Sequence, residues 1–236
     1  MTAVPYKGVE IFNKDGTFRK EDDVVQGRSY SSNLTKLLKQ LPKLQALQEG
    51  KKASPVMAHI SLTNACNLTC SFCCFANRDI SEKMPTEKVY QALESFKAIG
   101  VTGVEFTGGG EPSIHPHFKE IVQYAKDLGF SLGICTNGAR FGADRPIKKD
   151  IVELFDWVRL GMYGFYEGYD YDLSVFEGTN CKPSAAYVWD ENLETSKNPN
   201  ITGEWSDVKN KRVLSKKFQT TENFIRMLDW VEENQI

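Results

Sequence analysis

From Val56 onward the chain alternates between short apolar segments, typical of strands, and longer segments typical of helices. Two of the expected helices are followed by a glycine, Gly100 and Gly129, and glycine is the residue that most often terminates a helix. Strands and helices in regular alternation form a parallel sheet with helices packed on it. The sequence therefore predicts an α/β fold, an incomplete TIM-like (βα) barrel of parallel strands.

Four strands are expected in this barrel, and each runs directly into a loop with polar or glycine residues. The expected strands cover residues 56–62, 103–107, 130–135 and 157–162, and the expected helices cover 86–99, 115–128 and a segment that starts at Pro146. In barrels of this kind the active site lies at the C-terminal ends of the strands. The loops after the four strands are therefore expected to meet at one site.

The segments that flank these strands differ from them in character. We expect an N-terminal extension with a helix (1–55), the βα core (56–178), an irregular insertion (179–219) and a C-terminal helix (220–236). In the extension, leucines between Leu34 and Leu44 predict a helix that Pro42 kinks or breaks.

The number of strands after residue 162 has two interpretations. The favoured one has no fifth or sixth strand, and a weaker one places short strands at 185–189 and 212–214. With only about four βα units the sheet keeps an open edge. Either a partner chain, an oligomer or the insertion covers that edge, or the chain is truncated.

The composition narrows the classes of partner. The 236 residues include 29 basic and 31 acidic side chains, so we expect no nucleic-acid partner. Apolar runs are too short to span a membrane and residues 1–7 lack the apolar core of a signal peptide, so we expect a cytoplasmic protein without a membrane partner. Four of the six cysteines lie within residues 66–74, a spacing that suits metal binding in a reducing compartment better than disulfides.

Three of these cysteines, Cys66, Cys70 and Cys73, form a C-x3-C-x2-C pattern with Phe72 directly before the third. Three thiolates on one loop bind a soft metal centre well. An iron–sulfur cluster that is held by three cysteines, in place of the four usual in electron transfer, keeps one iron free to bind another molecule. The pattern therefore indicates a metal centre that takes part in chemistry.

Other metal and phosphate sites fit the sequence less well. Cys70 and Cys73 have the spacing of half a zinc ribbon, but His59, His115 and His117 lack the spacing of a second ligand pair. The glycines at 108–110 are not a phosphate-binding P-loop, because the following Glu-Pro replaces the required Lys-Ser/Thr. Three further cysteines receive no ligand role, and we expect Cys135 among them to be a small core residue at a strand end. They are Cys74, Cys135 and Cys181.

The cysteine pattern, followed after the next expected strand by Gly109-Gly110-Glu111-Pro112, resembles the radical S-adenosylmethionine (radical SAM) enzymes. The resemblance covers roughly residues 56–164 and implies a [4Fe-4S] cluster on Cys66, Cys70 and Cys73. The fourth iron would bind the amino and carboxylate groups of S-adenosyl-L-methionine. One electron would cleave this cofactor, and the resulting 5′-deoxyadenosyl radical would take a hydrogen atom from a substrate.

The resemblance also implies which residues contact the cofactor. Phe72 would face the adenine, Gly109 and Gly110 would let the backbone approach the methionine amino group, and Glu111 would either add charge or order its loop. Thr136 and Asn137, at the tip of the third strand, complete the set, although Thr136-Asn137-Gly138 on its own is only a turn signal. Beyond the cluster no catalytic residue is assignable.

The fourth strand departs from the family pattern. Gly161 stands where relatives often carry a polar residue that helps to hold the cofactor, so Arg159 or Tyr163 would have to compensate. The substrate, a small molecule or a peptide, is not specified by the sequence, and an external electron donor such as flavodoxin or ferredoxin is expected. The alternative function is a non-catalytic or truncated iron–sulfur protein, or less readily a zinc protein, that needs a partner chain.

Overall fold

The structure is a computed structural model. It describes residues 40–70, 73–75, 77–141, 147–162, 171–188, 212–214 and 221–234. The chain divides into two compact units, residues 1–54 and 55–236. In the first unit the described helix is α2 (Leu41–Gln48), in which none of the side chains is buried.

Pro42 lies in the first turn of α2. A proline is tolerated there because the first N–H groups of a helix have no partner within the helix. Within the described residues the helix therefore begins at Leu41, beside Pro42, where a kink or break was expected. The earlier part of the expected helix, residues 33–39, lies outside the described residues.

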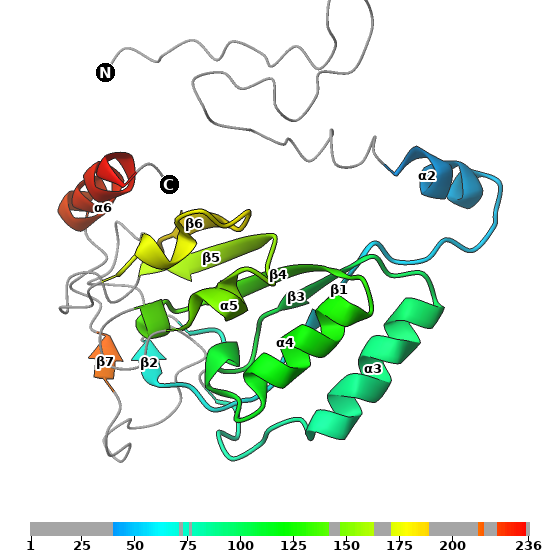
Figure 1. Ribbon diagram of the computed structural model, residues 1–236, viewed down its shortest axis with the longest axis horizontal. Helices are drawn as coiled ribbons and strands as arrows, with labels where there is room; N and C mark the ends of the chain where they lie inside the picture. The colour runs from blue at the N-terminus through cyan, green and yellow to red at the C-terminus, as the bar shows by residue number, and fades with distance from the viewer. Residues whose placement is uncertain are drawn as a thin grey trace, which may run out of the picture. The chain divides into compact units, whose positions relative to one another are not determined.

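The second unit is built on one open parallel sheet of five strands in the order β1-β3-β4-β5-β6 (Figure 1). Every neighbouring pair is parallel, which confirms the predicted α/β fold. The strands are β1 (Met57–Ile60), β3 (Gly103–Phe106), β4 (Ser131–Thr136), β5 (Trp157–Gly161) and β6 (Lys182–Ala186).

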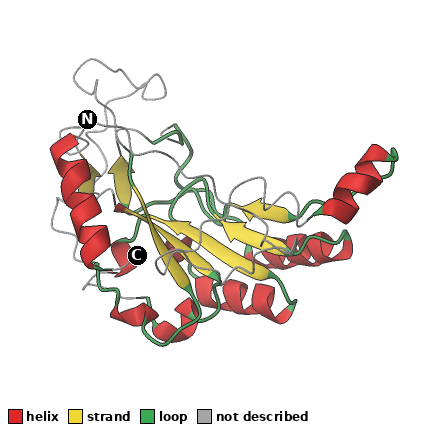
Figure 2. Ribbon diagram, turned by 90° about the horizontal axis from the view of Figure 1, so that it is seen from above, coloured by secondary structure: helices red, strands yellow, loops and turns green. Residues whose placement is uncertain are grey.

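Three helices cover one face of this sheet, as Figures 1 and 2 show. They are α3 (Thr86–Ala98), α4 (Phe118–Asp127) and the short α5 (Lys149–Val152). The third helix was expected to begin at Pro146, which lies outside the described residues. Each of the first two helices is followed within two residues by a positive-φ glycine, Gly100 and Gly129, as the sequence predicted.

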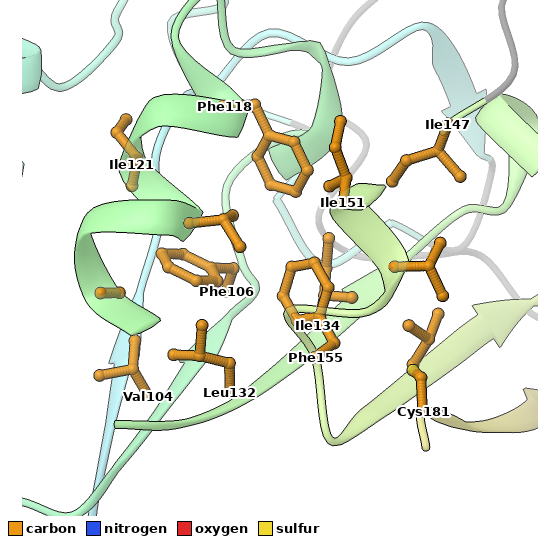
Figure 3. Close-up of a cluster of buried hydrophobic side chains, with 14 of the residues drawn as sticks. Val104, Phe106, Phe118, Ile121, Leu132, Ile134, Ile147, Ile151, Phe155 and Cys181 are labelled. Atoms are coloured by element: carbon orange, nitrogen blue, oxygen red, sulfur yellow. The ribbon is translucent and has the colours of Figure 1, made fainter. Parts of the chain in front are cut away.

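The hydrophobic core lies between the sheet and these helices (Figure 3). Alternate residues of a strand point to opposite faces, so Val104 and Phe106 on β3 face the helices together with Leu132 and Ile134 on β4. The ring of Phe106 meets Phe118 and Phe155 edge-on, at centroid distances of 6.4 and 6.3 Å. Burial of each of these large side chains contributes roughly 1.5–3 kcal/mol.

The favoured expectation that no strand follows the fourth is wrong, because β6 extends the sheet beyond β5 in parallel register from Trp157–Lys182 to Gly161–Ala186. The weaker interpretation placed this strand three residues too late. The sequence signal is poor because Lys-Pro-Ser-Ala-Ala lacks apolar alternation and contains Pro183, a residue that a sheet accepts mainly on an edge strand. In the described part of the chain β6 is such an edge.

The second short strand of the weaker interpretation is confirmed as β7 (Arg212–Leu214). It pairs in parallel with β2 (Leu68–Cys70) and forms a separate two-stranded sheet. Figure 1 shows the two strands side by side below the main sheet. The loop that carries the cysteines is therefore partly a strand.

The expected C-terminal helix is α6 (Thr221–Glu233). Its Met227 is buried, Phe224 packs on Tyr187 with ring centroids 5.6 Å apart, and Trp230 packs on Tyr171 at 6.1 Å. The helix thereby covers the segments on both sides of β6. Among the described helices, none combines the length and the apolar character that crossing a membrane requires.

Candidate functional site

A cavity of about 450 Å³ opens at the C-terminal ends of the strands. Its walls come from the cysteine loop after β1, the glycine loop after β3 and the ends of β4, β5 and β6. The residues that the sequence singled out and that line it are Cys66, Cys70, Cys73, Gly109, Gly110, Glu111, Thr136 and Asn137. Phe72 lies outside the described residues.

Cys66 is half-buried beneath the tip of β4. Its Sγ accepts hydrogen bonds from the Leu68 backbone N–H at 3.5 Å and from Asn137 Nδ2 at 3.7 Å. Burial raises the pKa of the Cys66 thiol, and the nearby Glu111 carboxylate adds to this effect. A metal that binds here must therefore displace the thiol proton.

Cys70 and Cys73 lie at the end of β2 and in the turn that follows it. The Cys73 N–H donates to the Cys70 carbonyl at 3.1 Å, and Cys73 Sγ accepts from Arg78 Nη1 at 3.4 Å. Arg78 also donates to the carbonyls of Asn64 and Phe75, both at 2.6 Å. The guanidinium of Arg78 thus ties the two ends of the cysteine loop together.

The donor set of this loop suits an iron–sulfur cluster in kind and number, because three soft thiols line one cavity. As placed, no three Cys, His, Asp or Glu side chains among the described residues lie close enough together to hold a single metal ion. A three-cysteine cluster spreads its ligands over several irons. Three cysteine thiolates are the ligand set that such a cluster requires.

The glycine loop packs against the segment that leads to Cys66. Gly110 N–H donates to the Thr63 carbonyl at 2.7 Å, and Glu111 N–H donates to the Ala65 carbonyl at 2.9 Å. A Cβ on Gly110 would overlap the Ala65 carbonyl, and Gly109 has φ +59°. The two glycines are required by this close approach of the two loops.

Glu111 is only 2% exposed, and both of its carboxylate oxygens are occupied. Oε1 accepts from Ser113 N at 3.1 Å, Ser113 Oγ at 2.6 Å and Thr136 Oγ1 at 2.8 Å, while Oε2 accepts from Asn137 N at 2.8 Å. The carboxylate therefore orders its own loop and joins it to the tip of β4. Asn137 extends the connection, since its Nδ2 donates to Asn67 Oδ1 at 2.8 Å as well as to Cys66.

The fourth core strand, β5, contributes Gly161 and Arg159 to the cavity wall. Gly161 offers no polar side chain, and Tyr163 lies outside the described residues. Arg159 is exposed to the cavity, and its guanidinium carbon lies 5.9 Å from the centre of the Trp157 ring.

Sequence reasoning misplaced Cys135, which lines the cavity instead of the core. Its thiol donates to Glu105 Oε1 at 3.1 Å, and burial together with this carboxylate raises the pKa of Cys135 to about 11. The signal was available, since Cys135 alternates with Leu132 and Ile134 along β4 and so faces the other side of the sheet. No sequence pattern indicated that Arg78 lies at the site, because only its contacts with Cys73 and with two backbone carbonyls show this.

The sequence model of the radical SAM superfamily matches residues 60–168 of the chain. This range holds the cysteine loop, the glycine loop and the strands from β3 to β5. Residues 60–168 therefore match the radical SAM superfamily, the family that the motifs of the sequence resemble.

Several curated proteins are similar in sequence to part of the chain. The chain is 31% identical over 98 residues to an S-adenosylmethionine-dependent nucleotide dehydratase of Selenomonas ruminantium, a match of 42% of this chain and 35% of that protein. It is 30% identical over 135 residues to Fe-coproporphyrin III synthase of Methanosarcina barkeri, 56% of this chain and 33% of that protein. The matched part spans about a third of these curated relatives.

Two solved structures show the same fold. SuiB of Streptococcus suis bound to S-adenosylmethionine superposes with a TM-score of 0.52 at 20% identity, over 89% of this chain and 46% of SuiB. SuiB bound to the precursor peptide SuiA gives 0.53 at 17% identity, over 93% of this chain and 46% of SuiB. These neighbours support the partial TIM-like barrel.

Proposed function

We propose that the chain is a radical SAM enzyme that holds a [4Fe-4S] cluster on Cys66, Cys70 and Cys73 and binds S-adenosyl-L-methionine beside it. The observation that supports this proposal is the shared cavity, which the three cysteines line together with the glycine loop and the tip of β4. When bound, the cluster supplies the electron that cleaves the cofactor and starts hydrogen abstraction from the substrate.

The residues of the chain serve this chemistry by holding the loops in place. Glu111 fixes the glycine loop to Thr136 and Asn137, and Asn137 reaches Cys66. The glycine loop and the tip of β4, which together form the proposed cofactor-binding wall, are thereby connected to the proposed cluster ligand Cys66. A displaced Glu111 would disturb both at once.

The backbone of the glycine loop forms a wall without side chains, which suits close contact with a ligand. Apolar side chains on the cavity, Leu68, Phe75, Ile80 and Val188, limit the access of water. Exclusion of water is what the protein must supply when its cofactor performs radical chemistry. Phe72 is proposed to face the adenine.

The reductant is proposed to be a small electron-transfer protein such as flavodoxin or ferredoxin. The exposed rim of the cavity includes Cys74 and Phe75, next to the proposed cluster ligand Cys73. A donor that docks at this rim would bring its own redox centre close to the cluster loop. The substrate is a small molecule or a peptide.

The cluster assignment is tested with four single substitutions. Cys66→Ala, Cys70→Ala and Cys73→Ala each remove one proposed ligand, and Cys74→Ala is the matched control, because Cys74 lines the same cavity and adjoins Cys73. Each protein is reconstituted without oxygen with iron and sulfide and is reduced with dithionite. Iron content, circular dichroism and electron paramagnetic resonance are then measured with and without S-adenosylmethionine.

We expect a reduced [4Fe-4S] signal that changes on addition of the cofactor in the wild type and in Cys74→Ala, and loss of that signal in the other three variants with the fold kept. Equal iron content in all four variants would contradict the assignment. A stable cluster whose electron paramagnetic resonance signal does not change on addition of the cofactor would favour the alternative of a non-catalytic iron–sulfur protein. Binding of zinc alone would favour a zinc protein.

A further inference from the structure

The cavity wall carries three charged side chains among the described residues: Arg78, Glu111 and Arg159. Two of them are engaged within the protein. Glu111 accepts four hydrogen bonds, and Arg78 donates to two carbonyls and to Cys73. The described residues provide no hydrogen-bond acceptor or carboxylate for Arg159, so its donors are available to a ligand.

Arg159 lies deeper in the barrel than the proposed cofactor-binding residues. It precedes Gly161 by two residues along β5, which corresponds to roughly 7 Å along the strand. Its register partners are Cys135 on β4 and Ser184 on β6, both in the body of the sheet. The glycine loop and Asn137, in contrast, follow the ends of their strands.

The guanidinium of Arg159 is supported by an aromatic ring. Its central carbon lies 5.9 Å from the centre of the Trp157 ring, and that ring lies against Gly133, where a Cβ would overlap the indole. An aromatic face attracts a cation but does not accept hydrogen bonds from the N–H groups that point outward in the plane of the guanidinium. The ring therefore stabilises the position of Arg159 and leaves the planar fork of donors open.

Within the part of the chain that the structure describes, no carboxylate pairs with this guanidinium. Glu105, the carboxylate on the same face of the sheet, contacts the Cys135 thiol at 3.1 Å and His59 Nδ1 at 3.6 Å instead. Cys135 itself stays a neutral thiol, since its pKa is raised to about 11. A positive charge with free, coplanar donors on a cavity wall is the arrangement that binds an oxyanion in a bidentate manner.

We propose that Arg159 binds an anionic group of the substrate, a carboxylate or a phosphate, at the deep end of the cavity. The proposal names the substrate class of the enzyme proposed above and rests on that function for the reaction that follows binding. The carboxylate of S-adenosylmethionine is a second source of the same chemistry, but it is expected at the open iron, beside the cysteine loop.

The test measures protection of Arg159 from phenylglyoxal, a reagent that modifies solvent-accessible guanidinium groups. The chain of 236 residues is treated at constant ionic strength with and without two probe anions, succinate and glycerol 3-phosphate. Succinamide and glycerol are the uncharged counterparts. Mass spectrometry of the digested protein gives the modification rate of each arginine, and Arg226, exposed on α6 and outside the cavity lining, is the internal control.

We expect one of the two anions to slow modification of Arg159 about fivefold or more, with Arg226 unaffected, and its identity distinguishes a carboxylate from a phosphate. Titration calorimetry with that probe should show about tenfold weaker binding in Arg159→Gln and partial recovery in Arg159→Lys. Absence of protection, equal protection of both arginines, or protection by S-adenosylmethionine in the reconstituted protein with none by the probes would overturn the proposal. Because protection by the probes needs neither cluster nor cofactor cleavage, a failure of the proposed enzyme activity would leave this result unchanged.

Discussion

Replacing Glu111 by glutamine keeps the size of the side chain and removes the charge that joins the glycine loop to β4. The amide oxygen of the glutamine can accept the three hydrogen bonds that Oε1 now accepts from Ser113 and Thr136. The amide nitrogen then faces the Asn137 N–H, so two donors meet where a carboxylate oxygen accepted one. At about 1–3 kcal/mol for each of these two unsatisfied buried donors, the free energy of unfolding should fall by roughly 2–6 kcal/mol.

Urea unfolding of the cluster-free protein, followed by circular dichroism, measures this loss. Glu153→Gln is the matched control, because Glu153 is exposed at the end of α5, and its unfolding free energy should change by less than about 0.5 kcal/mol. After reconstitution, Glu111→Gln should also hold less cluster than wild type, since Asn137 loses its link to Cys66. An unfolding free energy and an iron content equal to those of the control would refute the role of Glu111 as the link between the loops.

Three further predictions concern the loops, the thiol of β4 and the core. Gly110→Ala should lower the unfolding free energy by roughly 2–4 kcal/mol and reduce cluster content, because the new Cβ displaces the Ala65 carbonyl, whereas Gly103→Ala has room and should change little in the same urea titration. Cys135 should react with iodoacetamide far more slowly at pH 8 than a free thiol, because burial and the Glu105 carboxylate raise its pKa to about 11, which leaves only about one thiolate in a thousand. Glu105→Gln removes the second of these causes, so the modification rate measured by mass spectrometry should increase severalfold, and an unchanged rate would contradict the contact. Phe106→Ala should cost about 3–5 kcal/mol by thermal or urea unfolding, and a loss below 1 kcal/mol would contradict its central place in the core.

The first four strands of the sheet could be predicted because buried parallel strands with glycine-terminated helices leave a repeated pattern. β6 could not, since an edge strand needs neither an apolar alternation nor a full set of N–H donors, and Pro183 fits it for the same reason. β7 is equally weak in sequence, and its pairing with β2 depends on a contact between segments that lie far apart in the chain.

The candidate site shows the same division between local pattern and tertiary contact. The cysteine and glycine motifs could be predicted because their spacing is local and unusual. The contacts of Arg78 and Arg159 could not, since one donates to Cys73 and the other lies beside a ring that packs over Gly133; the sequence named Arg159 only as a possible replacement for the polar residue missing at Gly161. For Glu111 the sequence left two roles open, to add charge beside the cofactor or to order its loop, and the hydrogen bonds in the structure connect its carboxylate to its own loop and to β4.

The most direct test of the proposed function is the formation of 5′-deoxyadenosine by the reconstituted chain. The protein is loaded with iron and sulfide without oxygen, reduced with dithionite, and incubated with S-adenosylmethionine, and the product is separated by chromatography. We expect 5′-deoxyadenosine and methionine in equal amounts from the wild type and from Cys74→Ala, and none from Cys66→Ala. A reduced cluster that binds the cofactor and yields no 5′-deoxyadenosine would contradict the proposed enzyme.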